Sequence, residues 1–287
     1  MPYFDMPLED LRAYKPAVAE PEDFDSFWAS TLVEARNAGG DVSITPIDTG
    51  MTSFDSFDVT FPGFAGEPIR AWLTLPAQAS GLLPAVVTYK GYGRGRGLPH
   101  EQLTWAAAGY ATLVMDTRGQ GSSWGTGGHT PDPYGSDPST PGFMTQGIGD
   151  HHSYYYRRLI TDAVRAIDTV RGLKAVDPAR ITAAGTSQGG GIALAVAGLV
   201  PDLFALLSDV PFLNHFERAV GLTGNQPYAE IATYLSVHRH TKDTVFRTLS
   251  YFDGVNFAKR ATAPAMFSAA LMDQTCPPST VFAAANT

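Results

Sequence analysis

The feature that most constrains the fold is a short motif at residues 185–189, Gly-Thr-Ser-Gln-Gly, which follows an apolar run and precedes an Ala/Leu/Val-rich stretch. A Gly-x-Ser-x-Gly sequence between a strand and a helix is typical of a nucleophile elbow, where glycines let two backbones pass closely and the serine stands on a strained turn. A flexible turn or a phosphate loop is the alternative. The chain has no Lys-Ser/Thr pair of a P-loop, so the motif favours the elbow and makes Ser187 the candidate nucleophile.

Apolar runs on both sides of this motif alternate with helical patterns. The runs at 85–89, 110–115, 204–209 and 265–272 predict strands buried on both faces of a parallel sheet, and the apolar periodicity at 159–170 predicts a covering helix. Alternating segments at 54–61 and 69–75 predict an antiparallel pair, and 27–35 predicts a helix capped by Asp25 or Ser26. The order predicts an α/β-hydrolase fold with a mostly parallel central sheet and helices on both faces. We expect one domain over residues 1–287, with a helical and hairpin extension to about residue 80.

Composition narrows the function classes. The chain of 287 residues has a formal net charge of −8, which disfavours nucleic acid and anionic lipid as partners and favours a small neutral or cationic substrate. Its single cysteine, Cys276, excludes an internal disulfide, and no basic leader or run of about 18 apolar residues is present. These observations predict a cytoplasmic protein with no membrane partner.

A catalytic acid is expected beyond a later strand, in the order Ser, Asp/Glu, His. Asp273 ends the apolar run at 265–272 and precedes the turn-forming residues 276–278, so it is the candidate acid. Asp209, at the end of the preceding predicted strand, is the alternative.

The oxyanion donors are expected to be backbone N–H groups. One is that of Gln188, directly after the nucleophile, and the other is that of Tyr92, in the glycine-rich loop at 90–97. Two basic residues of this loop, Arg94 and Arg96, are interpreted as surface charges.

A Gly/Pro-rich segment at 119–156 is long enough to predict a functional or interfacial role. Its histidines, His129, His151 and His152, have no carboxylate or thiol at usual ligand spacing, so we expect no metal site. The tyrosines at 154–156 are interpreted as packing or interface surface. Together with the aromatic N-terminal segment, this segment predicts exposed apolar surface and subunit contacts.

Several motifs together resemble carbohydrate esterase family 7, the acetyl xylan esterases and cephalosporin C deacetylases. They are Arg118-Gly119-Gln120, the elbow, and the blocks at 154–157, 209–213, 246–253 and 271–283, so the resemblance spans nearly the whole chain. It implies that Ser187 is the nucleophile, Asp273 the acid, and the N–H groups of Tyr92 and Gln188 the oxyanion hole. Arg118 and Gln120 become structural supports, and Gly91, Phe212 and Pro227 are expected to line the substrate pocket.

The resemblance also implies a substrate, a cofactor requirement and an assembly. It predicts removal of acetyl groups from short xylo-oligosaccharides, cephalosporin C-like esters and other small acetyl esters, without a cofactor, in a homo-hexamer whose sites face an internal cavity. The nearest rival of the same fold is a serine peptidase.

Two positions depart from the family pattern. Lys90 stands where many members have histidine, and no histidine follows His240, whereas the family's catalytic histidine lies downstream of the acid. We therefore expect either a truncated esterase that lacks a C-terminal strand and helix, or a non-catalytic member.

Overall fold

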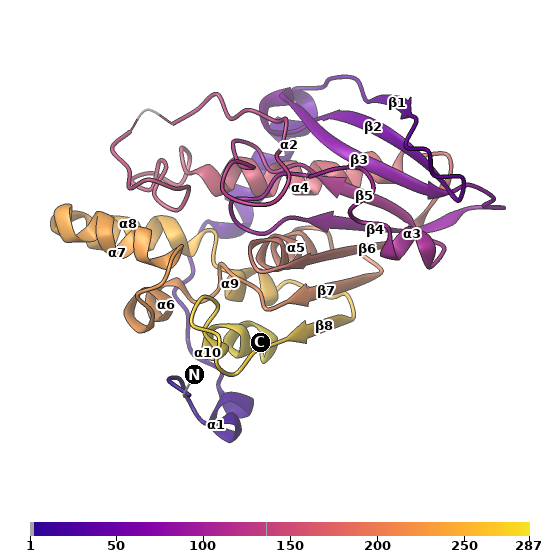
Figure 1. Cartoon of the computed structure of the whole chain (residues 1–287). Coiled ribbons are helices and arrows are strands. Elements are labelled where there is room, and N and C mark those ends of the chain that lie inside the picture. The colour runs from indigo at the N-terminus through magenta and orange to yellow at the C-terminus, as the bar shows by residue number, and fades with distance from the viewer. Residues whose placement is uncertain (1–2, 136) are drawn as a thin grey trace.

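The computed structural model describes residues 3–135 and 137–287, and its centre is an eight-stranded sheet in the order β1-β2-β3-β5-β4-β6-β7-β8 (Figure 1). The strands are β1 (Ser43–Ile47), β2 (Phe54–Pro62), β3 (Pro68–Pro76), β4 (Leu83–Tyr89), β5 (Ala111–Met115), β6 (Val176–Thr186), β7 (Ala205–Asp209) and β8 (Ala265–Ser268). The helices are α1 (Leu8–Ala13), α2 (Phe24–Asn37), α3 (Thr104–Ala107), α4 (Tyr155–Arg171), α5 (Gln188–Leu199), α6 (Phe216–Leu222), α7 (Tyr228–Val237), α8 (Lys242–Ser250), α9 (Gly254–Ala258) and α10 (Pro278–Ala285), with short 3-10 turns η1 (Phe64–Gly66) and η2 (Arg239–Thr241).

The sheet has an antiparallel part and a parallel part. β2 pairs antiparallel with β1 and with β3, which confirms the predicted hairpin, and β3 pairs antiparallel with β5. From β5 onward the neighbours β4, β6, β7 and β8 are parallel. Since parallel strands need crossover connections, their carboxyl ends gather at one edge. Figure 1 shows this edge facing α6, α7 and α8.

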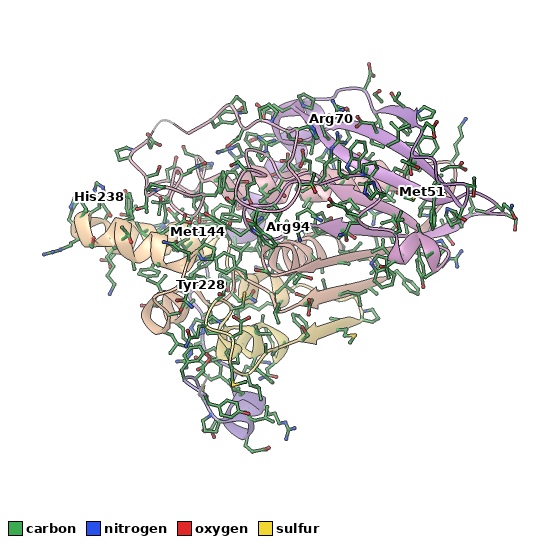
Figure 2. All side chains as sticks on the ribbon, viewed as in Figure 1. Met51, Arg70, Arg94, Met144, Tyr228 and His238 are labelled. Carbon is green, nitrogen blue, oxygen red and sulfur yellow. The ribbon has the colours of Figure 1, made fainter. Side chains whose placement is uncertain are left out.

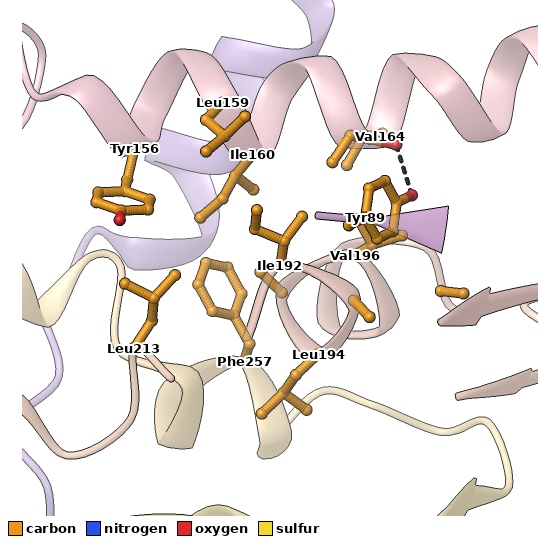
Figure 3. Close-up of a cluster of buried hydrophobic side chains, with 14 of the residues drawn as sticks. Tyr89, Tyr156, Leu159, Ile160, Val164, Ile192, Leu194, Val196, Leu213 and Phe257 are labelled. Carbon is orange, nitrogen blue, oxygen red and sulfur yellow. Dashed lines mark hydrogen bonds between the residues drawn. The ribbon is translucent and has the colours of Figure 1, made fainter. Parts of the chain in front are cut away.

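Helices cover both faces of the sheet, as expected for the α/β-hydrolase fold. On one face, Tyr89 at the end of β4 donates its hydroxyl to the Ala163 carbonyl of α4 at 2.9 Å, and side chains of α4 and α5 interlock above the strands (Figure 3). Thr88 and Lys90, whose side chains alternate with that of Tyr89, line a cavity on the other face together with Trp105 of α3.

Helix α4 is more deeply buried than its sequence pattern predicts. The tyrosines at 154–156 are fully buried, and the charged residues Arg158 and Asp162 of the same helix are also buried. Phe24, Phe27 and Trp28 of α2 are likewise buried. The expectation of exposed apolar surface is therefore wrong for these residues, because the chain's own core accommodates them, whereas Tyr3, Trp124 and Tyr134 of the same two segments are exposed.

Two predicted boundaries are also wrong. Helix α2 begins at Phe24, so the expected caps Asp25 and Ser26 lie inside it, and Asp23 precedes it without a side-chain capping bond. Strand β8 ends at Ser268 and is not buried: Met266 is 70% exposed, because β8 hydrogen-bonds to β7 on one side only in the described chain. Within the described residues, no helix is both long and apolar enough to cross a membrane.

Candidate active site

The nucleophile elbow joins β6 to α5. Ser187 has φ 57° and ψ −120°, a conformation that costs a residue with a side chain about 1–3 kcal/mol and is found mostly at functional sites. A Cβ on Gly185 would lie 2.3 Å from Gly189, and a Cβ on Gly189 would lie 2.1 Å from the Tyr89 carbonyl oxygen. The two glycines of the motif are therefore required by the crossing of β4, β6 and α5.

Backbone hydrogen bonds fix the peptide groups of Ser187. Its N–H donates to the Asp209 carbonyl at 2.9 Å, and its carbonyl accepts from Phe212 N at 2.9 Å. The loop after β7 thus supports the strained turn from both sides, so the hydroxyl is presented without relying on its own side-chain contacts.

The expected oxyanion donors remain available for a substrate. Within the described chain, the N–H groups of Tyr92 and Gln188 have no protein acceptor, whereas the neighbouring Gly93 N–H donates to Gln120 Oε1 at 2.6 Å. One of these N–H groups directly follows Ser187 in the chain, and the other belongs to a residue that lines the same cavity as Ser187. Unclaimed N–H groups near a serine hydroxyl are what an oxyanion hole requires.

A buried pair of glutamines connects these two donors. Gln120 Nε2 donates to Gln188 Oε1 at 3.0 Å, and Gln188 Nε2 donates back to Gln120 Oε1 at 3.3 Å. Gln188 also donates to the Lys90 carbonyl at 3.2 Å and accepts from the Tyr156 hydroxyl at 2.9 Å. Gln120 donates to Tyr155 at 2.9 Å. The pair therefore ties the loop that carries Gln120 and the loop of Lys90 and Gly93 to the first residue of α5.

A second contact holds Tyr92 from the other side. Its hydroxyl donates to Glu230 of α7 at 2.6 Å and accepts from Phe143 N at 2.5 Å. Burial raises the pKa of Glu230, and burial and the Glu230 carboxylate raise the pKa of Tyr92. Glu230 carries no signal in the sequence, because it lies 138 residues from Tyr92 and resembles any other glutamate on a helix.

Ser187 opens into a cavity of about 310 Å³. It is lined by Gly91, Tyr92, Arg94, Trp124, Thr186, Ser187, Gln226, Pro227 and Thr275. The expected pocket residues Gly91 and Pro227 thus line the same cavity as Ser187. Phe212 is not among the lining residues: it is fully buried, with its ring 6.3 Å from that of Tyr92.

Asp273 lies in the turn after β8 and approaches Ser187 through Cys276. Its Oδ1 accepts from Thr275 N at 2.7 Å and from Cys276 N at 3.0 Å, and the Cys276 sulfur lies 3.8 Å from Ser187 Oγ. Burial raises the pKa of Cys276 to about 12, so the thiol stays protonated at neutral pH. The alternative acid, Asp209, accepts hydrogen bonds from Thr186 at 3.0 Å and from Ser268.

The histidines occupy other places in the described structure, where none hydrogen-bonds to Ser187 or Asp273. His151 stacks on Tyr251 at 4.1 Å, and burial lowers its pKa. His215 stacks on Tyr14, and burial, with a smaller contribution from Arg218, lowers its pKa to about 4. His151 is therefore packed against the aromatic ring of Tyr251.

Two arginines near the site are buried. Arg118 is fully buried and forms ion pairs with Asp162, Glu67 and Asp132; burial acts to lower its pKa, but Asp162 raises it on balance. Its carbonyl accepts from Tyr155 at 2.7 Å, beneath the glutamine pair. Arg96, expected on the surface, is 1% exposed, because it stacks on Trp72 at 3.6 Å and pairs with Asp58.

Comparisons with known proteins agree with this geometry. An acetyl esterase of Xylanibacter ruminicola is 30% identical over 271 residues, which are 93% of this chain and 60% of that protein, so the chain spans less than two thirds of the curated relative's length. The acetyl xylan esterase from Paenibacillus sp. R4 is 40% identical, with a TM-score of 0.92 over 98% of this chain and 89% of that one. Acetyl xylan esterase 1 from Thermoanaerobacterium sp. JW/SL YS485 is 34% identical, with a TM-score of 0.91 over 99% of this chain and 89% of that one.

More distant similarity marks the fold alone. An acylaminoacyl peptidase of Pyrococcus horikoshii is 14% identical, with a TM-score of 0.56 over 83% of this chain and 35% of that one. The family model for acetyl xylan esterase (AXE1) matches residues 1–287. With the elbow, the glutamine pair and the full-length match in agreement, the chain belongs to the acetyl xylan esterase family.

Proposed function

We propose that this protein is a serine esterase that removes acetyl groups from small esters, including short acetylated xylo-oligosaccharides and cephalosporin C-like compounds. The observation that carries the proposal is the strained Ser187 facing a cavity beside the unclaimed N–H groups of Tyr92 and Gln188. The names of the relatives, acetyl esterase and acetyl xylan esterase, support the acyl group.

The proposed reaction has two steps. Ser187 Oγ attacks the acetyl carbon while a base takes its proton, and the two N–H groups bind the resulting oxyanion. The C–O bond to the alcohol breaks, the alcohol leaves with the proton, and an acetyl-serine remains. Water then attacks the acetyl carbon and gives up a proton to the base, the bond between the acetyl carbon and Ser187 Oγ breaks, the proton returns to Oγ, and acetate is released. Asp273 is proposed to orient the base.

We also propose that the 287-residue chain by itself hydrolyses esters slowly, because none of the described histidines contacts Ser187 or Asp273. Loss of the base removes most of the rate of a catalytic triad and leaves a residual about 10³–10⁴-fold over water. A small base added in solution is then expected to restore part of the lost rate.

The test measures acetate release from 4-nitrophenyl acetate with and without imidazole, after subtracting the reaction of imidazole alone. The unaltered chain is expected to accelerate with imidazole and to show covalent acetyl on Ser187 by mass spectrometry. The Ser187→Ala variant is expected to do neither. Equal rates for the two proteins under both conditions reject the esterase assignment. Full activity of the unaltered chain without imidazole rejects the proposal that the chain lacks a catalytic base. The expected hexamer and the cytoplasmic location stay predictions, and light scattering tests the first.

A further inference from the structure

Two cationic side chains next to the nucleophile lack a protein partner. In the described part of the chain, neither the Arg94 guanidinium nor the Lys90 ammonium forms a side-chain hydrogen bond or ion pair, although Lys90 is only 6% exposed. The buried arginines Arg118 and Arg158 differ from Lys90 and Arg94, since each pairs with carboxylates. A cation that is largely removed from water is costly without an anionic partner, and the half-buried Arg94 adds a second positive charge beside Lys90, which makes this pair of residues a candidate for binding an anion.

Arg94 is held in place by packing. Its guanidinium lies 4.2 Å from the centre of the Trp124 ring, and the Trp124 Nε1–H donates to the Tyr92 carbonyl at 2.9 Å. On the next residue, a Cβ at Gly125 would lie 3.0 Å from an Arg94 nitrogen. The stacked arginine is therefore fixed relative to the oxyanion loop, while its N–H groups stay free for a ligand.

The two cations face adjoining cavities. Arg94 lines the cavity of about 310 Å³ that contains Ser187 and also a second one of about 320 Å³ that contains Lys90. Gly91 and Thr186 form walls of both. Figure 2 shows Arg94 beyond the end of β4, at the edge of the sheet where these cavities lie. An ester bound at Ser187 can thus extend its alcohol part past Arg94 toward Lys90.

The local charge differs from that of the whole chain. Burial lowers the pKa of Lys90, Arg94 lowers it further, and the more remote Glu101 and Asp116 act in the opposite direction. Asp116 is already satisfied by the N–H groups of Arg96 and His129. Although the net charge of −8 favours neutral or cationic substrates, the charged residues that line these two cavities are two cations, Lys90 and Arg94, and one carboxylate, Asp209.

We propose that Arg94 and Lys90 form a carboxylate-binding subsite for the alcohol part of the ester. Acetyl esters whose alcohol carries a carboxylate, such as acetylated acidic sugars, are then bound in preference to neutral ones. The proposal rests on the acetyl esterase function proposed above. Asp209, the acidic residue in the second cavity, is engaged by two hydroxyl groups, and the anion lies between the two cations rather than against it.

The experiment uses probes that need no turnover. Calorimetry compares 4-hydroxybenzoate with its neutral amide, 4-hydroxybenzamide, which has nearly the same shape. Because a charge-assisted hydrogen bond contributes about a factor of ten in affinity, the carboxylate is expected to bind about tenfold more tightly. Arg94→Gln and Lys90→Met are each expected to remove this preference, whereas Arg239→Gln, at an exposed site, is expected to retain it.

Equal affinity for both probes, or no binding of the carboxylate, overturns the subsite. An equal loss of affinity for both probes in the Arg94 variant also overturns it, because it indicates that Arg94 only supports Trp124. Turnover of 4-nitrophenyl acetate in the same samples reports separately on the esterase function. A carboxylate preference without Ser187-dependent turnover supports the subsite and rejects the esterase. Ser187-dependent turnover without a carboxylate preference supports the esterase and rejects the subsite.

Discussion

Replacing Gln120 by leucine tests whether the glutamine pair sets the oxyanion hole. The change removes the acceptor of the Gly93 N–H, a bond of 2.6 Å, and one of the partners of Gln188. Tyr155 still hydrogen-bonds to the Arg118 carbonyl, and Gln188 still hydrogen-bonds to the Lys90 carbonyl and the Tyr156 hydroxyl. Among these groups, only the Gly93 N–H is therefore left without a hydrogen-bond partner. One buried unsatisfied group costs about 1–3 kcal/mol, and the weakened amide contacts add about 1 kcal/mol, so unfolding should become easier by about 2–4 kcal/mol.

The kinetic effect of this change should be larger than its effect on binding. Gly93 directly follows Tyr92, so a displaced Gly93 moves the Tyr92 N–H, and loss of one oxyanion donor reduces kcat by about 10²–10³-fold. An oxyanion exists only in the transition state, so KM should change little. The assay is 4-nitrophenyl acetate hydrolysis in the presence of imidazole, together with urea unfolding. Gln146→Leu, which removes a single 2.8 Å bond to Gly142, is the matched control. An unchanged kcat with reduced stability would refute the reasoning, since Gln120 would then support only the fold.

Two other predictions concern folding. Gly189→Ala should destabilise the chain by more than about 3 kcal/mol or prevent folding, because the new methyl would lie 2.1 Å from the Tyr89 carbonyl oxygen. In Gly149→Ala the new methyl meets open space, so the free energy of unfolding in urea should change by no more than about 0.5 kcal/mol. Equal unfolding midpoints for the two variants would contradict this. His215, with a folded pKa of about 4 against an ordinary 6.5, takes up its proton more readily when unfolded, so its contribution should diminish as pH falls from about 6.5 to about 4. His215→Asn, which tolerates the φ of 46°, should remove that loss, and a stability difference between the two proteins that is constant over this pH range would disprove it.

Local patterns predicted the parallel strands, the hairpin and the elbow, because each depends on the order and period of neighbouring residues. The glycines at 185 and 189 are required by contacts within one strand-turn-helix unit, which the motif itself encodes. The strand predicted at 265–272 is present at Ala265–Ser268, but it is shorter than expected and not buried, because apolar content does not distinguish a central strand from an edge strand and β8 has one neighbour in the described sheet.

Contacts between residues that are distant in the chain could not be predicted from the sequence. The buried position of Arg96 depends on Asp58 and Trp72, both supplied by earlier strands. Glu230 likewise joins Tyr92 across 138 residues. Charged residues were read as exposed because burying an unpaired charge is costly, and the carboxylates that offset this cost are distant in the chain.

The backbone contacts of Ser187 have a consequence for how substrate range can diverge. Both of its peptide groups are held by main-chain atoms of residues 209 and 212, which any side chain supplies. The cavity walls at Trp124, Pro227 and Thr275 come from three separate loops whose side chains make none of these bonds. Mutation can therefore remodel the walls one loop at a time while the turn that carries the nucleophile is inherited unchanged, so new specificities need not pass through intermediates with a displaced serine.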